Sequence, residues 1–101
     1  MKLKYQTKSI DVTTTKNPTI LKYRFQKLYY AIIIKNCNRY SSIANKQRID
    51  IVMTDDNLKI LSYKTDMHEN TVFANEKATT TVLLPPNYFS NLEEGQSFQL
   101  D

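Results

Sequence analysis

The sequence predicts an α+β fold: a mostly antiparallel sheet, closed as a small barrel or strongly bent, with one main helix near residues 18–29. Short runs rich in β-branched and aromatic residues recur along the chain and are typical of strands. Two of these runs flank the turn residues Asp55-Asp56-Asn57, which favours a hairpin. Asn17-Pro18 places a capping side chain before a proline, as at the start of a helix.

Length and composition indicate a single domain, residues 1–101, with one modest core. A domain of this size buries roughly 60–70% of the surface that its unfolded chain exposes. Seven Tyr, four Phe and a hydrophobic fraction of 41% supply that core and argue against disorder. One Cys and one His exclude an internal disulfide framework and an ordinary structural zinc site, and no cofactor is expected.

The first part of the chain is expected to hold a strand or hairpin arm, the helix and a central strand. Lys2–Thr15 is rich in Lys, Thr, Ile, Val and Tyr, which suits a strand or hairpin arm. One face of the helix would carry Leu21, Phe25, Leu28 and Tyr29. Apolar and polar residues also alternate strictly over 21–26, which fits a half-buried strand, but the Asn-Pro start favours the helix. The apolar run Ala31–Lys35 predicts a strand in the middle of the sheet.

The second part is expected to be mainly strands. Residues 36–45 are polar and irregular, with a possible strand over 40–44. Arg48–Thr54 and Leu58–Tyr63 form the predicted hairpin, and residues 66–77 form a polar connection. Residues 78–84 predict a strand that Pro85-Pro86 stops, because proline cannot donate to a ladder. Pro86 opens a short helical turn through Leu92, and Gly95 leads into a final strand over 96–100.

Charge is unevenly distributed along the chain. Residues 1–48 carry eleven Lys or Arg and one acid, a net charge of +10. Residues 49–101 carry three Lys and nine acids, a net charge of −6, and the two parts sum to +4. This polarity is suited to steering a charged partner.

Targeting features point to a soluble, cytoplasmic protein with no membrane partner. The N-terminal residues turn polar before an apolar segment of signal-peptide length begins. The longest apolar run, Ala31–Ile34, is far too short to cross a bilayer.

Four stretches resemble the domain of unknown function 192 family, also called uncharacterised ACR. Residues 37–61 are similar to the family's polar segment, Ile-Asp strand, charged turn and returning strand. Residues 78–85 and 94–96 look like its Val-Leu-x-Leu-Pro strand and its Gly-Asp turn, and residues 25–28 are similar to its amphipathic helix. The family's Gly-Leu-Met after the helix is absent. The resemblance implies a compact, mostly β domain without an assigned activity.

Asp50 and His68 are the candidate ligand-binding residues. An inward-pointing Asp50 could bind a small polar ligand or carry a proton, whereas alternation with Ile49 and Ile51 would turn it to solvent or pair it with Arg48. His68 titrates near neutrality, but in a polar loop it is expected to be solvated. Cys37 is expected to be an inert, partly buried thiol. The spacing of Asp55, Asp56 and Asp66 lacks the calcium-loop pattern, so no metal site is predicted.

Basic and aromatic residues interleave in the first half and form the candidate nucleic-acid site. Cations attract phosphates, and exposed aromatic faces stack on bases. The candidate residues are Lys16, Lys22, Tyr23, Arg24, Lys27, Lys35, Arg39 and Tyr40. The competing interpretation is that the aromatics belong to the core and the cations to an ordinary solvated face.

The leading hypothesis is a non-catalytic protein-interaction domain with a charge-polarised surface. Such a surface would bind an acidic protein surface or support self-association. Nucleic-acid binding through the basic half is the first alternative. The second alternative is a small-ligand or enzymatic domain using Asp50, His68 or Cys37, which requires these three side chains to meet in one pocket.

Overall fold

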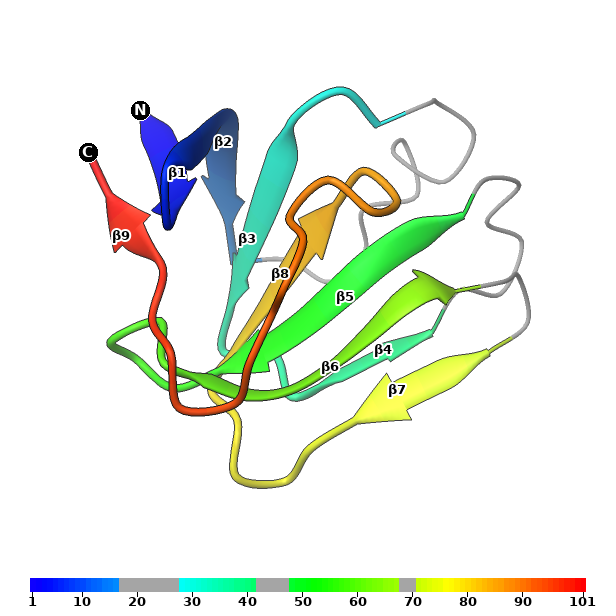
Figure 1. Cartoon of the computed structure of the whole chain (residues 1–101). Coiled ribbons are helices and arrows are strands. Elements are labelled where there is room, and N and C mark those ends of the chain that lie inside the picture. Colours follow the sequence, from blue (N-terminus) through cyan, green and yellow to red (C-terminus); the bar gives the residue numbers. More distant parts are fainter. Residues whose placement is uncertain (17–27, 42–47, 68–70) are drawn as a thin grey trace.

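The computed structural model describes residues 1–16, 28–41, 48–67 and 71–101, which form an all-β fold (Figure 1). Within these residues there are nine strands: β1 (Lys2–Tyr5), β2 (Lys8–Thr15), β3 (Ala31–Lys35), β4 (Arg39–Ser41), β5 (Ile49–Thr54), β6 (Ile60–Met67), β7 (Val72–Ala74), β8 (Thr80–Leu84) and β9 (Gln99–Leu100). Seven strands form one curled sheet in the order β6-β5-β8-β3-β2-β1-β9, and β4 pairs with β7 in a separate ribbon.

The α+β assignment is therefore wrong, because the described residues contain no helix. Most of the helix predicted near residues 18–29 lies outside the described residues, and Leu28 and Tyr29 are not helical. The short helical turn expected over residues 86–92 is a series of turns and bends instead. Asn87 and Asn91 have φ values of 57° and 59°, and such left-handed residues interrupt a right-handed helix.

The prediction of a mostly antiparallel, strongly bent sheet is confirmed. Among the described strands, every pairing is antiparallel except β2 with β3, which runs parallel from Val12↔Ala31 to Thr15↔Ile34. A parallel pair needs a long connection, and β2 and β3 are separated by residues 16–30 in the sequence. The apolar strand β3 lies at the centre of the sheet, as expected from its composition.

Backbone hydrogen bonds join the two ends of the curled sheet. The amide of Ile60 donates to Gln96 O at 2.7 Å, Gly95 N donates to Ile60 O at 2.9 Å, and Phe98 N donates to Leu58 O at 3.0 Å. The same segment continues into β9, which pairs with β1. Gly95 has a φ of 90°, so this turn needs glycine for its backbone conformation and not for space.

The core has two layers, one on each face of the sheet. The concave face encloses aliphatic residues of β1, β3, β5 and β8 together with Phe89, Leu92 and Phe98. The convex face is covered by the β4–β7 ribbon, whose Tyr40 and Phe73 pack against the outward side chains of β3 and β5. All residues of β5 and β8 are therefore buried, which explains why these strands do not alternate between polar and apolar residues.

The predicted hairpin between residues 48 and 63 is confirmed, although its turn differs in detail. Asp55 Oδ1 accepts hydrogen bonds from the amides of Asn57 and Lys59, both at 2.9 Å. The left-handed residue is Leu58, with a φ of 61°, and its side chain lies in the concave core. The polar connection over residues 66–77 also contains an unexpected strand, β7, which is only three residues long.

Candidate functional site

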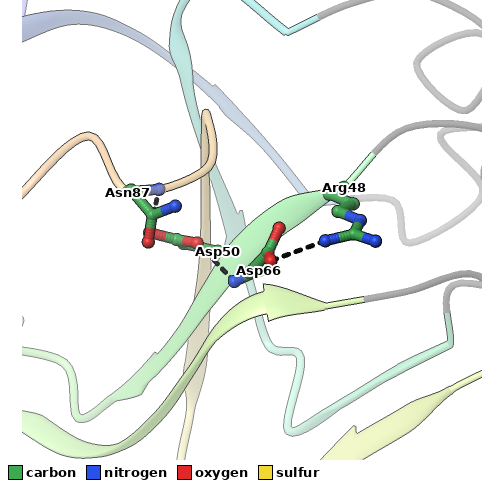
Figure 2. Close-up of polar contacts among 4 residues, drawn as sticks. All are labelled: Arg48, Asp50, Asp66 and Asn87. Atoms are coloured by element: carbon green, nitrogen blue, oxygen red, sulfur yellow. Dashed lines mark hydrogen bonds and ion pairs between the residues drawn. The ribbon is translucent and has the colours of Figure 1, made fainter.

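Asp50 lies on the concave face of β5 and is fully buried, with 0% of its surface exposed. Its carboxylate accepts two backbone hydrogen bonds: Asp66 N donates to Oδ1 at 2.7 Å, and Asn87 N donates to Oδ2 at 2.8 Å (Figure 2). The expectations that Asp50 faces solvent or pairs with Arg48 are wrong. The Arg48 guanidinium instead bonds the Asp66 carboxylate, with 2.8 Å between Nη1 and Oδ2.

The two amides that Asp50 binds belong to bends in the backbone. Asp66 and Asn87 have φ values of 52° and 57°, and the register between β5 and β6 shifts between Ile49 and Ile51, near Asp66. Left-handed backbone is unfavourable for residues other than glycine, so it requires support from the surrounding structure. The Asp50 carboxylate gives that support by joining β5 to the β6 bulge and to the loop after β8.

Burial is the main cause that raises the pKa of Asp50 above its ordinary value. The hydrogen bonds from the two amides oppose this rise, and the nearby Asp66 carboxylate adds to it. Because both carboxylate oxygens already accept backbone hydrogen bonds, the arrangement assigns Asp50 to holding the fold together.

Asp50 and Cys37 lie on opposite faces of the sheet. Cys37 belongs to the convex cluster and is 6% exposed, and its thiol donates to Arg39 O at 3.2 Å. His68 lies outside the described residues. A site built from Asp50, His68 and Cys37 would need all three side chains in one pocket. Asp50 and Cys37 do not share a pocket, because the sheet lies between them.

We expect the Cys37 thiol to react with a disulfide reagent roughly a hundredfold more slowly in the native protein than in denaturant. The reason is that a buried thiol is reached only through local or global opening of the structure. The reagent releases a coloured thiolate as it reacts, and the absorbance of that thiolate gives the reaction rate of Cys37. Equal rates in buffer and denaturant would contradict the burial of this side chain.

The candidate nucleic-acid residues are only partly described. Lys22, Tyr23, Arg24 and Lys27 lie outside the described residues. Lys16, Lys35 and Arg39 are exposed, as a binding role requires. Tyr40 is 5% exposed and packs in the convex cluster, so its proposed stacking on bases is wrong. In β4, Tyr40 lies between Arg39 and Ser41, and its side chain points toward the apolar convex face of the large sheet.

We refer to Lys16, Lys35 and Arg39 as the basic cluster; the first two lie at the ends of neighbouring strands, β2 and β3. The parallel register pairs Thr15 with Ile34, so the next residues, Lys16 and Lys35, follow side by side. Arg39 begins β4 directly after the turn that leaves β3. Within the described part of the chain, none of these three cations forms an ion pair.

The lysines of the β1–β2 hairpin differ from the basic cluster because each has a partner. Lys2 pairs with Asp11 at 2.7 Å, and Lys4 pairs with Asp101 at 3.3 Å. Lys8 donates to Tyr88 O at 2.8 Å, and its ammonium lies over the Tyr88 ring at 4.1 Å from the centroid. Folding therefore neutralises part of the positive charge of the first half.

One pocket was not foreseen from the sequence. It has a volume of about 210 Å³ and is lined by residues from β2, β3, the β5–β6 turn, β8 and both chain ends. These segments are distant in sequence, so only the closed curl of the sheet brings them together. We refer to it below as the mouth pocket.

Among the described residues, no group of three His, Cys, Asp or Glu side chains is arranged to hold a metal ion. The described part also contains no helix that would cross a membrane. The chain matches no model of a protein family, and neither a curated protein nor a solved structure shows significant similarity to it.

Proposed function

We propose that this protein is a non-catalytic interaction domain that binds an acidic protein surface through the basic cluster of Lys16, Lys35 and Arg39. The observation that carries the proposal is the parallel register of β2 and β3, which sets Lys16 beside Lys35. Among the described residues, no acid is paired with either lysine. Like charges on neighbouring strands repel one another. A partner that supplies carboxylates would relieve this repulsion.

The arrangement of the sheet supports an electrostatic partner. β2 and β3 are neighbours in the sheet, so the strand ends that carry Lys16 and Lys35 lie together. A local concentration of positive charge steers a partner of opposite charge and fixes its orientation. A second copy of the chain is also complementary, so self-association belongs to the same hypothesis.

Nucleic acid remains the alternative partner. Nucleic-acid binding has weaker support because Tyr40 is buried. Tyr40 is the only described aromatic residue among the candidates that the sequence suggested for stacking on bases. Phosphate contacts alone give binding that is strongly salt-dependent and insensitive to sequence. The proposal includes a relationship to the domain of unknown function 192 family. That relationship implies no particular reaction for this chain.

Fluorescence anisotropy with a labelled oligoglutamate peptide tests the proposal. We expect saturable binding at low salt, and a roughly tenfold or greater loss of affinity in the Lys16→Glu and Arg39→Glu double variant, because two attractive charges become repulsive. The control is the Lys59→Glu and Lys64→Glu double variant, which makes the same charge change on β6 and its turn. Light scattering of the unmodified chain measures self-association in parallel.

The outcomes separate the hypotheses. Equal losses in the two double variants would show binding to net charge alone and would contradict the basic cluster as a site. A labelled single-stranded DNA of equal length is titrated under the same conditions. Tighter binding to that DNA, with a steep dependence of affinity on salt, would place nucleic acid first.

A further inference from the structure

The mouth pocket lies at one end of the curled sheet, where the concave core reaches solvent. Its inner wall includes Ile33, which is 1% exposed, and Leu58, which is 9% exposed. Its rim carries Met1 and Leu100, which are 64% and 46% exposed. Large hydrophobic side chains that stay exposed next to an apolar hollow are a feature of ligand sites.

The size of the mouth pocket fits a small molecule. Its volume is about 210 Å³. A cavity of roughly 150 Å³ lined by aliphatic and aromatic side chains is large enough to bind benzene. The pocket therefore has room for a ligand somewhat larger than benzene, with a branched aliphatic group of a few carbons at its inner end.

Two residues of opposite charge stand on the rim of the pocket and do not pair with each other. Lys35, at the end of β3, and Asp56, in the β5–β6 turn, both line it, yet they form no ion pair with each other. Asp56 is oriented by Thr79, whose hydroxyl donates to Oδ1 at 2.6 Å. An apolar wall with a separate cation and anion at the entrance matches a ligand with an apolar end and two opposite charges.

We propose that the mouth pocket binds a free aliphatic α-amino acid. The aliphatic side chain would contact Ile33 and Leu58, Lys35 would bind the carboxylate, and Asp56 would bind the ammonium group. This site is separate from the proposed acidic-surface binding: only Lys35 belongs to both, and Asp56 and the apolar wall take no part in the basic cluster.

Titration of the ¹⁵N-labelled full chain with leucine, followed by amide chemical shifts, tests the proposal. We expect saturable shifts at residues around the pocket, including Lys35, Asp56 and Leu100. Three comparison compounds each lack one group of leucine: glycine keeps both charges but lacks the side chain, 4-methylpentanoate lacks the ammonium group, and isoamylamine lacks the carboxylate. Each is expected to bind roughly fivefold or more weakly, because each lacks one of the three contacts.

Variants of the lining residues complete the experiment. Thr14→Trp fills the entrance from an exposed position of β2 and is expected to abolish the leucine shifts. Asp56→Asn keeps the acceptor for Thr79 and is expected to weaken leucine roughly fivefold. Lys59→Met, outside the pocket, is the control and should bind as the unmodified chain does. Amide spectra of each variant confirm that the fold is intact.

Several results would overturn the proposal. Leucine shifts that fail to saturate, or that are equalled by glycine, would show that the apolar wall takes no part. Binding of 4-methylpentanoate or isoamylamine as tight as that of leucine would exclude a zwitterionic ligand. Unchanged leucine binding in Thr14→Trp would place the ligand elsewhere. These results leave the oligoglutamate experiment unaffected, because its double variant changes Lys16 and Arg39 only.

Discussion

Replacing Asp50 with alanine is expected to lower the free energy of unfolding by about 3 kcal/mol, or to lower Tm by about 15 °C. The substitution removes the acceptor of two backbone amides, those of Asp66 and Asn87. Each unsatisfied buried donor costs about 1–3 kcal/mol, and loss of the desolvated charge offsets part of the sum. Denaturant unfolding followed by circular dichroism measures the change.

Asp50→Asn and Asp11→Asn are the matched comparisons. Asparagine keeps one acceptor but presents an NH₂ group to the other amide, so we expect a loss of about 2 kcal/mol. Asp11 is an exposed acid paired with Lys2, and its substitution should leave stability close to that of the unmodified protein. If Asp50→Ala were as stable as Asp11→Asn, the carboxylate would not support the two bends.

The difference in stability between the unmodified protein and Asp50→Asn is expected to depend on pH in a defined direction. Because the folded protein raises the pKa of Asp50, the folded state binds this proton more tightly than the unfolded chain does. The contribution of this group to stability is fully present below the ordinary aspartate pKa of 3.8 and is lost as pH rises through the raised pKa. The unmodified protein should therefore gain stability relative to Asp50→Asn as pH falls through that range.

Replacing Phe98 with alanine is expected to cost about 4 kcal/mol. Phe98 is 3% exposed, and its ring centroid lies 5.5 Å from that of Tyr5 and 5.7 Å from that of Phe89. These three rings fill the concave core beside the segment that joins β6 to β9. Truncation removes both the buried area and the aromatic contacts, and leaves a cavity at the junction.

Hydrogen exchange gives this second prediction a local readout. Phe98→Ala should speed exchange of the Gly95 and Ile60 amides, whose hydrogen bonds join the two ends of the sheet. Tyr63→Ala, on the partly exposed face of β6, is the control and should change stability by less than about 1 kcal/mol. Similar losses in the two variants would mean that the aromatic cluster does not stabilise the junction.

The strands that the sequence predicted correctly are those with local signals. The hairpin over residues 48–63 is specified by turn residues next to two apolar runs, and Asp55 makes the turn contacts that its side-chain chemistry favours. β3 was recognised because a strand buried on both faces has a continuous apolar run, and β8 because its β-branched residues are followed by Pro85-Pro86. β7 was missed because three residues carry too little periodicity to be distinguished from a loop.

The site residues were harder to predict because their environment is non-local. Alternation with Ile49 and Ile51 suggested that Asp50 faces water, on the assumption that one face of the sheet is solvated. The loop after β8 covers the concave face at Asp50, while the β4–β7 ribbon covers the convex face. The expected helical turn after Pro86 failed for a related reason: left-handed Asn87 directs its amide to Asp50 and interrupts the turn.

The sequence by itself determined the strand-rich character, the hairpin and the central apolar strand, because these depend on contacts between neighbouring residues. The tertiary structure decided the all-β class of the described residues, the parallel pairing of β2 with β3, the burial of Asp50 and the mouth pocket. Each of these depends on segments far apart in the chain, and their pairing is selected by how completely the two faces of the sheet bury apolar surface and satisfy backbone hydrogen bonds.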